Sequence, residues 1–335
     1  MIYITLIFSF SIFLLFSKKY SKLSTDKNAR LAHQMYTADK YVPLLGGYFI
    51  LIPVFSNHTI LFQNLLFLFI FLTGVLSDIR LLNSPKLRFL IQFCLAMVFI
   101  IFSKTYINNT SIDILDNLLG YKFFNILFVT FCILILMNGT NFIDGLNGLV
   151  SGYYIITLLV IIYLGNNNID TINYNFYKIL IFTLSIIFIL NLLNKIYLGD
   201  GGSYLLSFVI GISTIKLYSQ NSQLSSLFIV LLFWYPCFEN LFSIIRKLYQ
   251  KKSPLHPDNK HFHQLTFNFI KNKFKIKNNL LSNNITSILI IFYNMGVLFV
   301  GSLYAQSTNF QVFIIAFNVL LYIFLYQKLD KHNTK

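Results

Sequence analysis

The feature that most constrains this chain is a series of long apolar segments that follow one another over almost its whole length. Hydrophobic residues make up 56% of its 335 residues and charged residues only 11%, whereas soluble domains carry about 25% charged residues. Many of the segments approach the roughly 20 residues that a helix needs to cross a bilayer. We therefore expect an all-α, multi-pass membrane protein that forms one integral-membrane domain over residues 1–335.

Eleven of the apolar segments are candidate transmembrane helices. The first has no basic residue before it and no small-residue cleavage site after it, so we interpret it as a retained span and not as a signal peptide. An odd number of spans places the two termini on opposite sides of the membrane. The predicted spans lie near residues 2–17, 43–56, 60–76, 88–103, 121–137, 147–165, 176–193, 204–217, 225–248, 283–304 and 310–326.

Basic residues gather on one side of this arrangement. All of the 26 Lys and Arg residues fall on the side of the loop 18–42, except Lys104, Lys122, Lys178 and Lys216. The positive-inside rule therefore predicts an outside N-terminus and a cytoplasmic C-terminus. The net charge of +15 then reflects membrane topology. We expect no nucleic-acid partner, because no basic stripe with interleaved stacking aromatic residues stands apart from the spans.

Five unusually polar segments interrupt the apolar pattern, and all of them fall on the expected cytoplasmic side. They are the segments at residues 42–48, 74–88, 138–149, 198–203 and 256–263. The loops expected outside resemble ordinary polar linkers. The shared side predicts that the five segments converge on a single site at the cytoplasmic face.

Two of these segments have the chemistry of an anion and metal site. NGTNFIDGLNGL places Asn138, Asn141, Asp144 and Asn147 beside glycines that let a backbone approach a ligand. In LGDGGS, Asp200 precedes a predicted helix whose free N–H groups would face an anion, and its carboxylate suits Mg²⁺ bound to a diphosphate. The alternative for each segment alone is a capped polar turn.

The last polar segment, HPDNKHFH, concentrates histidines. His261 and His263 favour phosphate contact or acid–base chemistry over zinc binding, because the H-x-H spacing is a poor match to a structural zinc site and no Cys lies nearby. The alternative is a solvated loop. Glu239, the only glutamate of the chain, lies inside a predicted span, where we expect it to bond neighbouring helices or loops.

Taken in order, the five segments resemble the motifs of the polyprenyl-phosphate N-acetylhexosamine-1-phosphate transferases. The resemblance, to glycosyltransferase family 4 and its undecaprenyl-phosphate GlcNAc-1-phosphate transferases, covers about residues 26–265. It is carried by PLLGG, GVLSDIRLLNSPKLRFLIQ, NGTNFIDGLNGL, NKIYLGDGGS and HPDNKHFHQL. The chain departs from the family pattern at four positions, where Ser77, Asn147, Glu239 and Gln264 stand in place of Asp, Asp, Asp and His.

The resemblance implies transfer of a sugar-1-phosphate from a UDP-amino sugar to a polyprenyl phosphate such as undecaprenyl phosphate, with release of UMP. The lack of an HHH run favours UDP-GlcNAc or a deoxy relative over a muramyl-pentapeptide donor. This reaction would begin a cell-envelope glycan, such as lipopolysaccharide O-antigen or a cell-wall polymer, in the bacterial inner membrane. The other expected partners are membrane lipids, with a second copy of the chain as an open alternative.

The resemblance also assigns roles to individual residues. Asp200 would hold Mg²⁺, with Mn²⁺ as the alternative ion, and Asp78 would orient or deprotonate the lipid phosphate. His261 and His263 would contact phosphate, as further catalytic residues. The substrate-binding residues would be Gly46, Gly47, Lys86, Asn138, Asn141, Asp144 and Asn147.

Two other functions remain open on the sequence. A transporter would carry acids deep in its spans and broken helices at the membrane midplane, whereas Asp78, Asp144 and Asp200 fall at the ends of predicted spans. A catalytically inactive paralogue is suggested by Ser77, because serine cannot supply the carboxylate of the usual first acid.

Single cysteines at Asn109 and Asn259, in a variant without native cysteines, test the predicted orientation. If the loops rich in Lys and Arg are cytoplasmic, an impermeant thiol reagent added to intact cells should label position 109 and spare position 259. Labelling of position 259 from outside would show that the polar segments do not share a cytoplasmic face.

Overall fold

The computed structural model of this protein describes residues 42–57, 60–165, 174–221, 223–254 and 258–333. Within these residues the chain is helical, and its only bridge of the β type pairs Leu44 with Tyr197. The predicted all-α fold is therefore confirmed. The helices are α2 Gly46–Asn57, α3 Leu61–Asp78, α4 Pro85–Ser103, α5 Asp113–Leu119, α6 Lys122–Ile143, α7 Leu149–Gly165, α8 Tyr174–Leu192, α9 Gly199–Gln220, α10 Ser226–Leu232, α11 Trp234–Tyr249, α12 Phe262–Lys273, α13 Asn279–Leu303 and α14 Thr308–Asn333.

The predicted spans from 43–56 onward each coincide with a described helix, or with the pair α10 and α11 in the case of 225–248. The first predicted span, 2–17, lies outside the described residues. Six described helices are long and apolar enough to cross a membrane, or seven if the bent pair is one span, whereas α2 and α7 are shorter apolar helices. A multi-pass membrane protein is thus supported, while the count of eleven spans stays a prediction.

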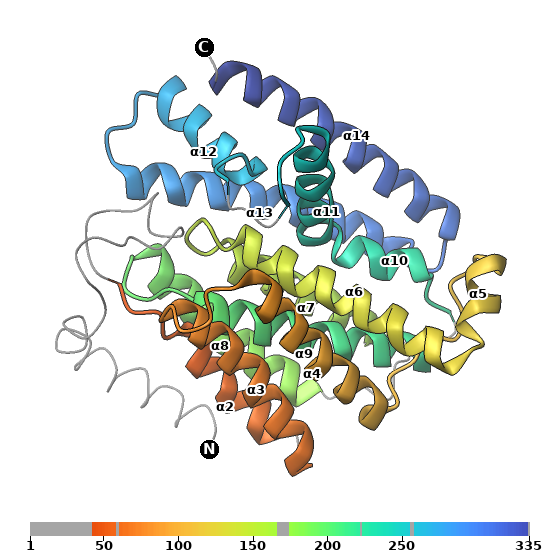
Figure 1. The fold of residues 1–335 in the computed structure, drawn as a ribbon. Coiled ribbons are helices and arrows are strands. Elements are labelled where there is room, and N and C mark those ends of the chain that lie inside the picture. The colour runs from red at the N-terminus through yellow and green to blue at the C-terminus, as the bar shows by residue number, and fades with distance from the viewer. Residues whose placement is uncertain (1–41, 58–59, 166–173, 222, 255–257, 334–335) are drawn as a thin grey trace.

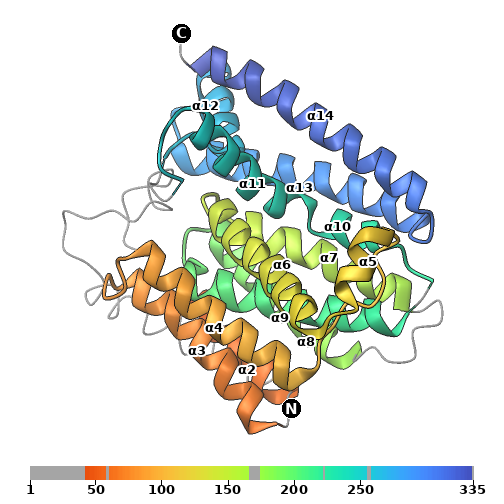
Figure 2. The ribbon, with the colours of Figure 1, turned by 45° about the vertical axis from the view of Figure 1, so that its right-hand side comes forward.

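Helix α9 lies at the centre of the bundle. It packs against α2, α3 and α6, and most of its side chains are buried. Figure 1 shows α2 to α4 and α6 to α9 gathered in one bundle, with α13 and α14 along one side of it. In the turned view of Figure 2 this second layer, which also holds α11 and α12, still lies on the same side of the bundle.

The bend between α10 and α11 has a clear chemical cause. The two helices meet at an angle of 78°, and Pro236 lies in the first turn of α11. Proline has no N–H to donate, and its ring clashes with the carbonyl group four residues earlier. That carbonyl belongs to Leu232, which instead accepts a hydrogen bond of 2.8 Å from the hydroxyl of Tyr153. Pro236 therefore causes the break, and Tyr153 of α7 stabilises it.

A glycine lets α11 approach α6 closely. A Cβ atom on Gly139 of α6 would overlap the backbone carbonyl of Pro236. Gly139 belongs to the polar segment 138–149, and α6 continues through the first half of this segment to Ile143. Part of what distinguishes this segment in the sequence is therefore helix packing.

Gly139→Ala should destabilise the protein, because the new methyl group forces the backbones of α6 and α11 apart. Overpacking of this kind costs about 1–3 kcal/mol, which a thermal unfolding measurement on detergent-purified protein would resolve. Gly296→Ala on α13 is the matched control, since its Cβ would have no neighbour within 4 Å. Equal melting temperatures for the two variants would contradict the close approach of α6 and α11.

Candidate active site

The first turn of α9 is held by a carboxylate from another helix. Asp78, the last residue of α3, accepts hydrogen bonds from the backbone N–H groups of Asp200 at 3.2 Å and Gly201 at 3.5 Å. These N–H groups have no partner within α9, and the helix dipole makes this end positive. The N-terminus of α9 thus faces the protein's own Asp78, and contact of these N–H groups with a substrate anion stays a prediction.

Glycines bring this turn close to its neighbours. Gly199, with φ +78°, places its backbone where a Cβ would lie 2.9 Å from an oxygen of Asp78. A Cβ on Gly74 of α3 would overlap the backbone of Asp200 and Gly201. An alanine at Gly74 would therefore push α3 away from the helix start that its own Asp78 caps.

Gly46 and Gly47, predicted to bind substrate, lie behind the first turn of α9. Their N–H groups donate to the carbonyl oxygens of Tyr197 at 2.9 Å and Leu198 at 3.2 Å. Both glycines are buried, and a Cβ on Gly47 would lie 2.6 Å from the backbone nitrogen of Gly202. The structure therefore gives these glycines a role in packing α2 against α9.

Asp200 collects hydrogen bonds from three separate segments. Its Oδ1 accepts from the side-chain amide of Asn141 at 2.6 Å, and its Oδ2 accepts from the hydroxyl of Ser77 at 2.8 Å. The guanidinium of Arg88 lies 3.5 Å from the same Oδ2 and also donates to the Ser77 hydroxyl. Asn141 is thus a neighbour of Asp200, and Ser77 bonds Asp200 instead of the adjacent Asp78.

Arg88 is a site residue that the sequence did not single out. It lies in the first turn of α4, which Ser84 caps and Pro85 begins. The only sequence signal for it was a basic residue in the polar segment 74–88. Lys86, which was predicted to bind substrate, is exposed two residues earlier and forms no ion pair with any described residue.

Asp144 is the third acid of the site. It directly follows α6 and is half-buried, and its carboxylate has no hydrogen-bond partner among the residues that the structure describes. Burial raises the pKa of Asp144 well above its usual value, and the charges of Asp200 and Asp78 raise it further. Asp144 is therefore the carboxylate in this cluster that is most available to a ligand.

The two remaining asparagines of the segment point elsewhere. The amide of Asn138 donates to the carbonyl of Leu134 within α6 at 2.8 Å. Asn147 is buried, and its backbone N–H donates to the side chain of Asn283 on α13 at 2.7 Å. The turn between α6 and α7 is thus tied to α13.

His261 and His263 lie against this same turn. A Cβ on Gly145 would lie 2.5 Å from Nε2 of His263, and the two imidazole rings stack with centroids 5.7 Å apart. His263 is fully buried and His261 nearly so, which excludes a solvated loop. Burial lowers the pKa of His263 to about 3, so its ring is neutral at physiological pH.

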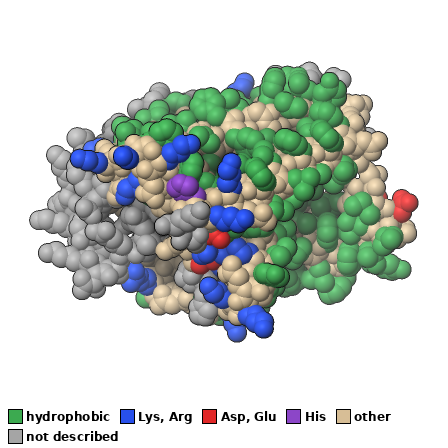
Figure 3. Space-filling view, turned by 90° about the horizontal axis from the view of Figure 1, so that it is seen from above, with side chains coloured by type: hydrophobic (Ala, Val, Ile, Leu, Met, Phe, Trp, Pro, Cys, Tyr) green, Lys and Arg blue, Asp and Glu red, His purple; other side chains and the backbone are tan. Residues whose placement is uncertain are grey.

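On one face of the molecule, most of the visible charged side chains lie together (Figure 3). Figure 3 shows Lys and Arg side chains gathered around acidic and His side chains toward one end of the face, while hydrophobic side chains cover much of the rest. Across the described ranges, no group of three or more His, Cys, Asp or Glu side chains is placed to hold one metal ion. The protein alone therefore forms no complete metal cage there.

Comparison with known proteins finds similarity in the part of the chain that carries these acids. Residues 60–218 match the family described as glycosyl transferase family 4. The chain is 28% identical over 232 residues to the undecaprenyl-phosphate alpha-N-acetylglucosaminyl 1-phosphate transferase of Thermotoga maritima, covering 67% of each chain. It is 28% identical over 244 residues to the probable enzyme of that kind from Bacillus subtilis, covering 67% of this chain and 65% of the relative.

A third relative extends the match. The undecaprenyl-phosphate alpha-N-acetylglucosaminyl 1-phosphate transferase of Escherichia coli K12 is 25% identical over 282 residues, with 76% of this chain and 72% of the relative covered. The residues that match the family include Ser77, Asp78, Arg88, Asp144 and Asp200, whereas His261 and His263 lie outside the matched range. Residues 60–218, which carry the acidic cluster, are thus similar to glycosyl transferase family 4.

Proposed function

We propose that this protein transfers a sugar-1-phosphate from a UDP-N-acetylhexosamine to undecaprenyl phosphate and releases UMP. The observation that carries the proposal is the meeting of Asp78, Asp144 and Asp200 with Arg88 at the ends of helices α3, α4, α6 and α9. Proteins similar to this chain are named as transferases of N-acetylglucosaminyl 1-phosphate to undecaprenyl phosphate. UDP-GlcNAc, or a deoxy relative of it, is the proposed donor.

The proposed location follows from the two substrates. A lipid phosphate lies at the membrane surface, and a UDP-sugar arrives from the cytosol. The acidic cluster lies in segments that the distribution of Lys and Arg assigns to the cytoplasm. We therefore propose a site at the cytoplasmic face of the bacterial inner membrane.

The available carboxylates fit a magnesium ion that substrate helps to hold. Mg²⁺ usually binds one or two carboxylates together with substrate phosphates and water. The carboxylate of Asp144 has no hydrogen-bond partner in the described part of the chain, and Asp200 lies near enough to raise the pKa of Asp144. These two acids would hold the ion, with Mn²⁺ as the alternative. Bound there, Mg²⁺ would neutralise the diphosphate and stabilise negative charge during phosphoryl transfer.

Other residues of the chain have distinct proposed roles. Arg88 carries donors suited to phosphate oxygens, and its side chain is partly exposed beside Asp200. Both oxygens of Asp78 already accept N–H groups of α9, so this acid chiefly holds the site in shape. The carboxylate of Asp144 has no such bonds in the described part of the chain, so it is free to serve as a ligand of the ion.

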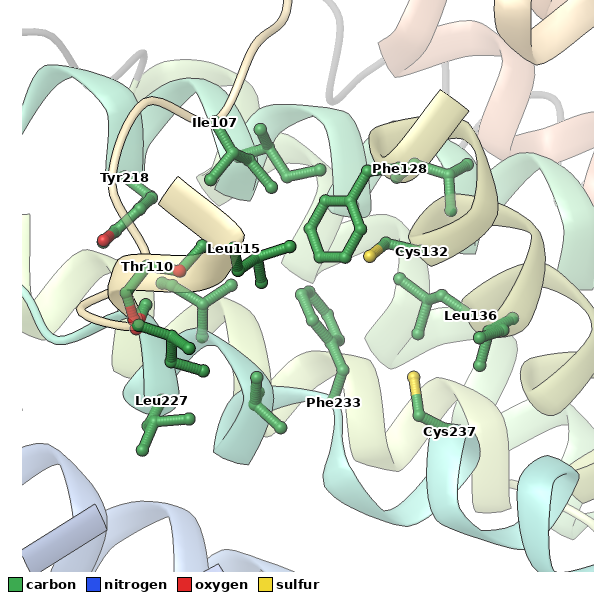
Figure 4. Close-up of a pocket in the computed structure, with 18 of the residues that line it drawn as sticks. Ile107, Thr110, Leu115, Phe128, Cys132, Leu136, Tyr218, Leu227, Phe233 and Cys237 are labelled. Atoms are coloured by element: carbon green, nitrogen blue, oxygen red, sulfur yellow. The ribbon is translucent and has the colours of Figure 1, made fainter. Parts of the chain in front are cut away.

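An apolar cavity of about 290 Å³ lies between α6, α9, α10 and α11. Figure 4 shows Phe128 and Cys132 of α6 on one side of it, with Phe233 and Cys237 on the other. Its lining is almost wholly hydrocarbon, and the exposed side chain of Val230 belongs to it. We propose that the cavity receives part of the isoprenoid chain of the lipid substrate.

A transporter explains the structure less well. Its expected broken helix is present as the bent pair α10 and α11. However, the buried acid of that pair, Glu239, already accepts hydrogen bonds from His261, Phe262 and Tyr322. The acids that remain available to a ligand lie at helix ends in the family-matched region.

Purified protein incubated with UDP-GlcNAc, undecaprenyl phosphate and Mg²⁺ should release UMP. Asp200→Asn should lose about 10²-fold or more in turnover, because an amide is a weak ligand for Mg²⁺ and leaves the diphosphate charge uncompensated. Lys86→Ala, at an exposed position at the start of α4, serves as the comparison and should lose much less. UMP release unaffected by Asp200→Asn would overturn the assignment, and no UMP with any UDP-amino sugar would overturn the function.

Ser77 distinguishes an adapted enzyme from an inactive one. Ser77→Ala removes one hydrogen bond to Asp200, a loss of about 0.5–1.5 kcal/mol, so turnover should fall only several-fold. Ser77→Asp places a second carboxylate where a hydroxyl donates at 2.8 Å, so the repulsion should lower activity further. UMP assays on the two variants check this order. An inactive wild type that Ser77→Asp restores would identify a degenerate site.

A further inference from the structure

We propose that Glu239 is a positioning residue that holds His261 in one tautomer and thereby seats residues 258–263 against the turn that carries Asp144. The inference rests on the proposed function for its kinetic consequence, whereas the tautomer follows from the geometry alone. Glu239 lies on α11, outside the family-matched residues 60–218.

Glu239 is buried almost completely, with 1% of its surface exposed. A buried carboxylate is costly unless hydrogen bonds satisfy it. Its Oε1 accepts from the Nδ1 of His261 at 2.9 Å and from the backbone N–H of Phe262 at 3.1 Å, and its Oε2 accepts from the hydroxyl of Tyr322 at 2.7 Å. One carboxylate thus joins α11, the start of α12 and α14.

This arrangement determines which nitrogen of His261 carries hydrogen. An ionised carboxylate only accepts hydrogen bonds, so the Nδ1 that faces Glu239 must be the donor. The neutral ring then has its lone pair on Nε2, which lies 3.6 Å from Oδ1 of Asp258. Asp258 is itself held by Arg246 at 2.7 Å, so the ring is enclosed on both edges.

The C-terminal helix closes the same segment from the other side. The hydroxyl of Tyr326 donates to the carbonyl of Lys260 at 3.0 Å, and the ammonium group of Lys260 pairs with Asp330 at 3.2 Å. The side chain of Asn333 donates to the carbonyl of Leu265 at 3.1 Å. Residues 258–265 are therefore anchored to α11 and α14 before they contact the acidic site.

The anchored histidines support the turn after α6. His261 packs against Phe142, with ring centroids 5.2 Å apart, and stacks on His263. His263 fills the space beside Gly145, where a Cβ would meet its Nε2. Phe142 lies two residues before Asp144, and Gly145 directly follows it. A shift of the His261 ring would therefore move the backbone that carries this acid.

Glu239→Gln tests the proposal with little change in shape. The amide has two orientations, and in one of them its oxygen accepts from Phe262 and His261 while its NH2 group donates to Tyr322. In the other orientation its NH2 group donates to His261 and gives up the bond from Phe262. The two orientations compete, so the Nδ1–H form is no longer enforced. The ¹⁵N chemical shifts of selectively labelled histidine, assigned with His261→Gln at pH 8, should show Nδ1–H alone in the wild type and a mixture in Glu239→Gln.

The kinetic readout separates positioning from folding. Outer residues that orient a functional histidine typically contribute 10- to 100-fold, so kcat for UMP release should fall by about tenfold or more in Glu239→Gln, with KM nearly unchanged. Glu239→Asp, which keeps the charge, should recover part of the loss. Tyr322→Phe, which removes only the bond to Oε2, is the matched control and should keep the wild-type tautomer.

Each outcome has a definite meaning. A folded Glu239→Gln variant with an unchanged His261 tautomer overturns the proposal, and so does a changed tautomer with wild-type kcat. A wild type that releases no UMP would overturn the proposed function, while the ¹⁵N measurement would still decide whether Glu239 controls the tautomer of His261.

Discussion

The structure depends on the cap that Asp78 places on the first turn of α9. A buried helix start carries unpaired N–H groups and a positive end, and most residues of the first turn of α9 are buried. Asp78 satisfies two of these groups from α3. Glycines on α2, α3 and α9 allow the approach. The cap therefore orients Asp200, because this acid is the second residue of the helix that is capped.

The replacement of an acid by Ser77 changes the electrostatics around Asp200. A second carboxylate at that position would add to the charges of Asp78, Asp144 and Asp200. Serine instead donates one neutral hydrogen bond to Asp200 and accepts from Arg88. The chain thus keeps the orientation of Asp200 with one negative charge fewer, which accounts for how the site can hold together without the adjacent acid pair.

Two separate supports meet at the turn between α6 and α7. From one side the charges of Asp78 and Asp200, at the end of α3 and the start of α9, raise the pKa of Asp144. From the other side His263 packs on Gly145, and its segment is anchored by Glu239 and the C-terminal helix. Substrate-binding groups on loops need this kind of rigid support, because a loop alone leaves their positions free. Helices beyond residue 218 thus contribute to the site through packing.

The bend of α10 and α11 and the apolar cavity beside it share one origin. Pro236 ends the regular helix, and Gly139 allows α11 to turn onto α6. Phe233 of the bend and Cys237 of α11 then line the cavity together with residues of α6. A single proline and a single glycine therefore shape the hydrocarbon-lined space that we assign to the lipid chain.

The sequence by itself determined the helical membrane class and most of the residues that meet at the site, because apolar segment length and polar interruptions act locally along the chain. Asp78, Asn141, Asp144 and Asp200 were all identifiable in this way. Which groups bond one another was decided only by the tertiary structure. Ser77 and Asp200 are separated by 123 positions, and nothing local indicates that Ser77 bonds Asp200, that Arg88 joins them, or that Gly46 and Gly47 pack helices. Those facts depend on where α2, α3, α4 and α9 cross, and the crossing is determined by close packing between distant segments.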